Sequence, residues 1–123
     1  QNEGRKIMHL PELTVGFLHP GGVERRASMG KDMSIDIYAL ALGDISFITA
    51  PYEMFNSNGR FIKEHSPYKM TFMSAYSNGS TSYIPAESSF PNGGYEGNSC
   101  RFVAGTGEGI ASHLVTMLNT LYQ

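Results

Sequence analysis

The sequence predicts an α/β fold in which helices flank a mixed sheet, and we expect this sheet to be a fragment of a larger α/β domain. Two observations support the prediction. Short apolar runs typical of strands alternate with segments whose apolar residues recur at helical spacing. The resulting order of strand, strand, helix, strand, loop and helix is typical of helices packed on a sheet. We expect a single domain over residues 1–123, with an irregular N-terminal segment over 1–33 and the α/β part over 34–122.

The first two strands of the α/β part are expected to form a β-hairpin. Residues 34–42 alternate between apolar and polar side chains at first and then become apolar on both faces. Gly43 and Asp44 give a tight turn, and residues 45–50 give a second strand that we expect to be mostly buried. Within the N-terminal segment, residues 13–18 are the stretch that resembles a strand.

A helix, a third strand and a long loop come next. Residues 53–65 fit a helix that ends before Ser66-Pro67, because the residue before a proline avoids the helical conformation. Residues 69–76 predict a strand. Residues 77–101 are rich in Ser, Gly, Asn and Pro, and a loop of that length in a compact domain is usually functional or disordered. The apolar face of the helix is expected to carry Met54, Phe55, Phe61 and Ile62.

The C-terminal helix is the best-defined element of the sequence. Apolar residues recur at helical spacing through residues 106–121. Thr106 is the expected N-cap, and Glu108 suits the positive end of the helix dipole in the first turn. His113 is expected to lie off the buried face. That face consists of Ile110, Leu114, Met117, Leu118 and Leu121.

Composition indicates a globular protein and argues against nucleic-acid binding. Apolar residues make up 41% of the chain and charged residues 16%, which is unlike a disordered chain. Nine basic against eleven acidic residues give a net charge of −2, so no basic stripe is available for phosphates. The single cysteine, Cys100, excludes an internal disulfide. The chain begins at Gln1, so we expect an excised piece; within it we expect no signal peptide, and no apolar run approaches the ~18 residues of a transmembrane helix.

The four histidines do not form a metal-binding pattern in the sequence. His9 and His19 lie in the N-terminal segment, His65 ends a predicted helix and His113 is in the middle of another. None belongs to an HxH, HxxxH or HxxEH pattern. A histidine at a helix C-terminus also has an ordinary role, because a cation interacts favourably with the helix dipole there. We therefore expect none of the four to be a ligand.

Glu53 and Tyr83 occupy positions where functional side chains of α/β proteins gather, just past the ends of strands. Glu53 follows the apolar run that ends at Ala50, and Tyr83 follows a second such run. Each also has an ordinary interpretation, Glu53 as a solvated carboxylate in the first turn of a helix and Tyr83 as packed aromatic surface. Twelve residues later, Tyr95-Glu96 follow two glycines and read as a turn with an exposed ring.

Taken together, these segments resemble the neutral/alkaline non-lysosomal ceramidase family. The resemblance runs through Glu53, Gly59-Arg60, Asn78, Tyr83 and Tyr95-Glu96, followed by a glycine-rich turn and an amphipathic terminal helix. It covers roughly residues 34–122 and is similar to the C-terminal part of that family's catalytic domain. The sequence departs from the family pattern where Tyr52 replaces a glycine before Glu53 and where Ser80-Thr81-Ser82 precede Tyr83.

The resemblance implies a zinc-dependent amide hydrolase that acts on N-acylsphingosine-type lipids through a zinc-activated water molecule. Family members bind one zinc ion through two histidines, one glutamate and one tyrosine. The matching positions make Glu53 and Tyr83 the expected metal ligands and Tyr95 the expected catalytic residue, whose phenol assists at the reacting amide. Both histidine ligands would come from an upstream part of the same polypeptide. The resemblance also implies a secreted, periplasmic or cell-surface location.

Two other functions stay open on the sequence. The first is a non-catalytic or degenerate ceramidase-like domain that serves as a scaffold or binding domain. The second is an unrelated α/β binding module whose loop over residues 77–101 holds a polar ligand. Under the enzyme hypothesis, we expect this chain by itself to be inactive and to hold zinc only weakly, because two ligands are too few for a tetrahedral zinc site.

Overall fold

The computed structural model describes residues 5–15, 33–77, 79–80, 83–91, 94–100 and 102–123. Within them a four-stranded sheet has the strand order β1-β2-β3-β5, and a separate two-stranded sheet pairs β4 with β6. β1 to β3 are antiparallel neighbours, whereas β3 and β5 run parallel. The strands are β1 (Arg5–Val15), β2 (Met33–Leu42), β3 (Ile45–Thr49), β4 (Glu53–Met54), β5 (Met70–Ser74) and β6 (Tyr83–Ile84).

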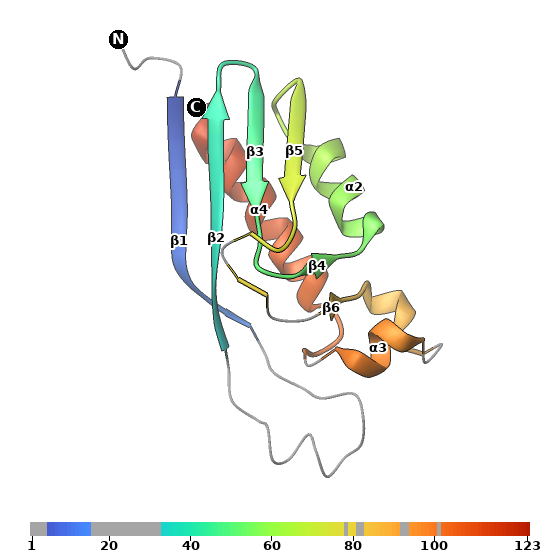
Figure 1. The fold of residues 1–123 in the computed structure, drawn as a ribbon. Coiled ribbons are helices and arrows are strands. Elements are labelled where there is room, and N and C mark those ends of the chain that lie inside the picture. Colours follow the sequence, from blue (N-terminus) through green and yellow to red (C-terminus); the bar gives the residue numbers. More distant parts are fainter. Residues whose placement is uncertain (1–4, 16–32, 78, 81–82, 92–93, 101) are drawn as a thin grey trace.

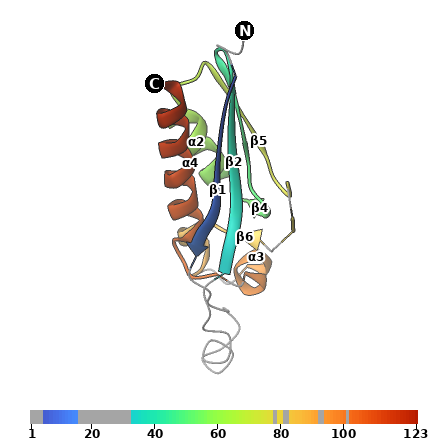
Figure 2. The same ribbon diagram turned by 90° about the vertical axis from the view of Figure 1, so that its left-hand side faces the viewer.

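Helices α2 and α4 lie on the same face of the four-stranded sheet (Figures 1 and 2). This arrangement confirms the predicted α/β class with a mixed sheet and flanking helices. The shorter helices η1 and α3 lie near β6, beyond one end of the large sheet (Figure 1). The helices are α2 (Asn56–His65), η1 (Glu87–Ser89), α3 (Tyr95–Ser99) and α4 (Thr106–Tyr122).

Strand β1 corrects the prediction that residues 1–33 are irregular. It spans eleven residues and pairs with β2 from Arg5 opposite Leu42 to Val15 opposite Met33. The register shifts between Leu10 and Leu13, where Pro11 lies. A bulge in an edge strand accommodates proline, which has no N–H to donate. The predicted strand over residues 13–18 overlaps the end of β1, and its residues 16–18 lie outside the described residues.

Strand β3 is buried on one face only, whereas the sequence predicted a mostly buried strand. Ser46 and Ile48 face the helices and are fully buried, whereas Ile45 and Phe47 point to the opposite face and are exposed. The buried Ser46 hydroxyl lies 2.8 Å from that of Thr71 on β5, so each polar group has a partner inside the core. The alternation gives the sheet a second face with exposed apolar side chains, made of Leu42, Ile45, Phe47, Met70 and Phe72.

Helix α4 buries the face that the sequence predicted. Ile110, Leu114, Met117, Leu118 and Leu121 belong to the core, and His113 is exposed. The start of the helix differs by one residue: Gly105 is the N-cap, and Thr106 makes no cap hydrogen bond. Gly105 has φ of 87°, a left-handed conformation that glycine adopts readily, and its carbonyl accepts the Gly109 N–H at 2.9 Å.

Three further predictions need correction near β4 and β6. The predicted helix over residues 53–65 begins only at Asn56, because Glu53–Met54 pair with Tyr83–Ile84 as short parallel strands. On α2 only Ile62 of the expected apolar face is fully buried. The segment 77–101, predicted to be a loop, contains β6, η1 and α3 within its described residues.

Candidate functional site

The candidate site lies beyond the C-terminal ends of the parallel strands β3 and β5 (Figure 1). The segments that follow the two strands stay hydrogen-bonded to each other. The Ala50 N–H donates to the Ser74 carbonyl at 3.2 Å, and the Ser77 N–H donates to the Ala50 carbonyl at 3.1 Å. Because these bonds hold the chain just before Glu53, they position the residues that form the site.

Glu53 and Tyr83 are brought together as the sequence predicted. They are direct partners in the parallel pairing of β4 with β6. Partners in register have side chains on the same face of the pair, so the carboxylate and the phenol are neighbours. The prediction that the two residues lie close together is confirmed, although they begin two short strands and do not end two long ones.

Tyr76 is a member of the site that the sequence reasoning missed. Its hydroxyl donates a hydrogen bond of 2.7 Å to Oε2 of Glu53. Its backbone has φ of 53°, an uncommon value for a bulky side chain, and its N–H donates to the Tyr52 carbonyl at 3.3 Å. The turn after β5 thus accepts local strain while directing the phenol at Glu53. The sequence feature that could have identified Tyr76 is its position just past the end of β5, the strand parallel to β3.

Tyr95 lies against the same group of side chains. It is the first residue of α3, after the N-cap Gly94, and its side chain is 71% exposed. Its ring meets that of Tyr83 edge to face, with centroids 5.9 Å apart. The residues predicted for the site, Glu53, Tyr83 and Tyr95, therefore form one contiguous cluster with Tyr76, and Tyr95 has the most solvent-accessible phenol.

The electrostatic field in this cluster favours a cation. The negative charge of Glu53, followed by burial, raises the pKa of the Tyr83 phenol above its ordinary value, and Tyr95 and Glu96 act in the same direction. The hydrogen bond to Glu53 raises the pKa of Tyr76 to about 12. Each of these effects reflects the cost of adding another negative charge to the cluster, and a bound cation would reverse it.

The donor set fits half of a zinc site. A carboxylate and a phenol supply two oxygen ligands, and a structural or catalytic zinc site needs at least three from protein. No group of three or more His, Cys, Asp or Glu side chains that could hold a metal ion occurs among the described residues. His65 binds the Phe61 carbonyl through Nδ1 at 2.8 Å, and His113 is exposed on α4. His19 lies outside the described residues, as does the side chain of His9.

The fold of this chain is similar to part of two solved ceramidase structures. One is described as a ceramidase complexed with C2, with a TM-score of 0.64 and 21% identity over 71% of this chain. The other is neutral ceramidase from Pseudomonas aeruginosa, with a TM-score of 0.63 and 22% identity over 70% of this chain. This chain spans 15% of the length of each.

The other comparisons find no relative. No protein-family model matches the sequence, and no curated protein matches it. A search for helices that combine the length and the apolar character needed to cross a membrane finds none in the part of the chain that the structure describes. The similarity to the solved structures therefore establishes a ceramidase-like fold at a distant level, matching part of a larger ceramidase domain.

Proposed function

We propose that this chain is part of a zinc-dependent amide hydrolase that resembles neutral ceramidase. The observation that carries the proposal is the in-register pairing of Glu53 with Tyr83. This pairing places two oxygen donors side by side just past the ends of parallel strands, where ligands of α/β proteins bind. The ceramidase-like fold supports the same proposed function as a separate observation.

In this proposal Glu53 and Tyr83 are two of the zinc ligands, and Tyr76 orients the Glu53 carboxylate. A hydrogen bond from outside the ligand set typically fixes the orientation of a metal-binding side chain. The 2.7 Å bond from the Tyr76 hydroxyl has this geometry. A bound zinc ion would act as a Lewis acid that polarises an amide carbonyl and activates water.

Tyr95 is the proposed catalytic residue. Tyr95 is exposed and its ring is positioned by Tyr83, and no described residue engages its hydroxyl as Glu53 engages that of Tyr76. A phenol in this position can donate a hydrogen bond to the oxygen that gains negative charge when the amide carbonyl is attacked. Tyr95 would thereby stabilise the transition state without binding the metal.

We further propose that the rest of a longer polypeptide completes the site and supplies two histidine ligands. The uncovered sheet face supports this partner, because monomeric soluble proteins rarely leave contiguous apolar patches exposed. On that face Phe47 and Phe72 stack with ring centroids 5.2 Å apart. The solved structures with the same partial fold are several times longer than this chain, so they contain chain that could cover such a face.

The proposed substrate is a lipid amide of the N-acylsphingosine type, and the proposed location is secreted, periplasmic or cell-surface. The description of one solved structure names a complex with C2, and the other is named a neutral ceramidase. Both proposals rest on this similarity and on the donor set at Glu53 and Tyr83.

The test compares Tyr95→Phe with Glu53→Ala in the full-length protein that carries this chain. Tyr95→Phe should lower turnover of an N-acylsphingosine by about a hundredfold while zinc content stays unchanged, because the phenol acts only in the transition state. Glu53→Ala should lose zinc and activity together. Tyr122→Phe is the matched control, because Tyr122 is exposed at the end of α4 and contacts Tyr68.

The outcome also separates the enzyme from a ceramidase-like scaffold. If Tyr95→Phe kept full activity on every amide tested, Tyr95 would only line the site and would have no catalytic role. The assignment of the two metal ligands would then be the part of the proposal that is retained. Retention of both zinc and rate by Glu53→Ala would contradict the ligand assignment. A full-length protein with no amide turnover and no zinc would favour the scaffold.

A further inference from the structure

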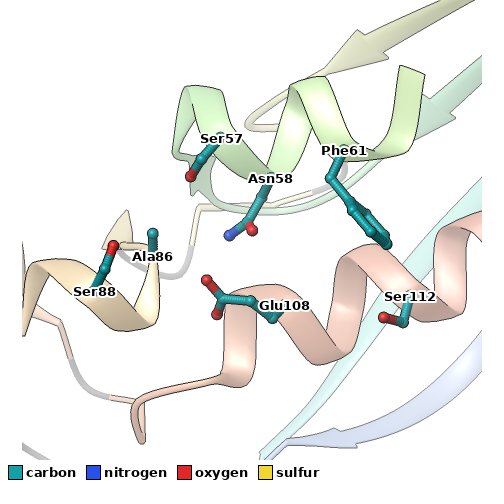
Figure 3. Close-up of a pocket in the computed structure, with 7 residues that line it drawn as sticks. All are labelled: Ser57, Asn58, Phe61, Ala86, Ser88, Glu108 and Ser112. Atoms are coloured by element: carbon teal, nitrogen blue, oxygen red, sulfur yellow. The ribbon is translucent and has the colours of Figure 1, made fainter. Parts of the chain in front are cut away.

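A second candidate site lies between α2, η1 and α4, on different elements from those that carry the Glu53 cluster. A pocket of about 340 Å³ opens there (Figure 3). Its lining combines an aromatic ring and a methyl group with hydroxyls, one amide and one carboxylate. The lining residues are Ser57, Asn58, Phe61, Ala86, Ser88, Glu108 and Ser112.

Two buried polar atoms in this pocket have no hydrogen-bond partner within the described part of the chain. Asn58 is 4% exposed, and its Nδ2 has no acceptor. Oε2 of Glu108 has no donor. The two side chains point toward each other from α2 and the first turn of α4 (Figure 3). Buried polar groups in folded proteins are nearly always hydrogen-bonded, so this pair needs an explanation.

The surrounding chain holds both groups in place. Oε1 of Glu108 accepts the Glu87 N–H at 2.9 Å, which fixes the carboxylate between α4 and η1. Gly107 allows the Asn58 amide to lie directly on α4, because a Cβ at residue 107 would be 2.5 Å from Nδ2. The chain therefore holds an unpartnered donor and an unpartnered acceptor in place, and because both atoms are buried, a ligand hydroxyl reaches them only when the two side chains move apart.

The polarity of the pair selects the chemistry of its ligand. An anion would be repelled by the Glu108 carboxylate, and a cation would meet the positive N–H end of the Asn58 amide. A hydroxyl group suits both, because it accepts from Nδ2 and donates to Oε2. The Phe61 ring, 37% exposed, offers an apolar face beside these groups, and the serine hydroxyls can bond further oxygens.

We propose that this pocket binds a small neutral polyhydroxylated ring, such as a single sugar unit, with one hydroxyl between Asn58 and Glu108. Its volume is near the lower end of the roughly 300–1,000 Å³ of small-molecule sites, which suits one ring and not an oligosaccharide. The site is independent of zinc and of the proposed hydrolase activity.

The test uses saturation-transfer NMR on the full-length protein with methyl β-D-glucopyranoside as the probe. We expect binding with a dissociation constant on the order of 1 mM. Glu108→Gln and Asn58→Asp should each weaken binding at least tenfold, because the first removes the acceptor charge and the second removes the donor. The matched controls are Glu64→Gln and Asn56→Asp on exposed positions of α2.

Charged relatives of the probe check the proposed polarity. Glucuronate and glucosamine should bind more weakly than the neutral glycoside. The proposal is overturned if the folded protein shows no saturation transfer at a probe concentration ten times the expected dissociation constant of about 1 mM. It is also overturned if both pocket variants bind as well as their controls, or if glucosamine binds more tightly than the neutral probe.

Discussion

Replacing Gly107 with alanine should destabilise the protein, although the same change two residues later should stabilise it. Both glycines lie in α4, where alanine is favoured over glycine by about 1 kcal/mol in a helix interior. At Gly109 a Cβ meets nothing within 4 Å, so Gly109→Ala should gain about 0.5–1 kcal/mol.

At Gly107 the neighbouring atoms reverse the sign of the expected stability change. A Cβ there would lie 2.5 Å from Asn58 Nδ2, 3.2 Å from Ile84 Cγ2 and 3.3 Å from the Pro85 carbonyl oxygen. Asn58 is almost fully buried and Pro85 contributes backbone, so neither can move freely. Overpacking of this kind costs about 1–3 kcal/mol, which exceeds or cancels the helix gain. The two variants should therefore differ by about 1–3 kcal/mol.

Urea unfolding followed by circular dichroism measures this difference, and thermal unfolding checks it. In a domain of this size 1 kcal/mol corresponds to about 4 °C in Tm. Adding Asn58→Ala should reduce the cost of Gly107→Ala, because it removes the nearest atom. A Gly107→Ala protein as stable as Gly109→Ala would refute the close contact between α2 and α4.

The other stability predictions concern the core and the buried thiol. Leu114→Ala and Leu118→Ala should each lower the free energy of unfolding in urea by about 2–5 kcal/mol, because both side chains are fully buried. The control His113→Ala should change stability by less than about 0.5 kcal/mol. Losses below about 1 kcal/mol at both leucines would mean that α4 is not docked. Burial raises the pKa of the Cys100 thiol, so the folded protein should resist a thiol reagent that labels the unfolded chain. Because the folded thiol holds its proton more tightly, its stabilising contribution is present below the ordinary thiol pKa of about 8.5 and is lost as the pH rises above it. Cys100→Ala should therefore lose less stability than the wild type between about pH 8 and 10. Equal losses of stability in the two proteins would contradict the raised pKa of Cys100.

Local periodicity was sufficient to predict the elements whose structure depends on neighbours in sequence. The buried face of α4 follows from its spacing, and the turn between β2 and β3 follows from Gly43, which has φ of 60°. β1 was missed because its pairing with β2 crosses a long segment of chain and because Pro11 masks the strand pattern. Similarly, Glu53 is in a strand only because its partner is thirty residues away in sequence.

The members of the candidate site that follow apolar runs could be predicted from the sequence. The member whose orientation depends on tertiary structure was missed. Glu53 and Tyr83 could be placed together because both lie just past such runs. Tyr76 could not, because only the left-handed turn after β5 directs its hydroxyl at Glu53. The pocket at Asn58 and Glu108 has no sequence signal, because it depends on how α2 docks against α4.

Anomalous X-ray scattering at the zinc absorption edge, on crystals of the full-length protein, tests the central claim most directly. The account predicts one peak about 2.0–2.2 Å from both a Glu53 carboxylate oxygen and the Tyr83 phenol oxygen, with two histidines from elsewhere in the polypeptide completing the site. Tyr76 should remain hydrogen-bonded to Glu53. A zinc peak elsewhere in the molecule, or no peak in crystals grown with zinc in excess, would contradict the assignment of Glu53 and Tyr83 as ligands.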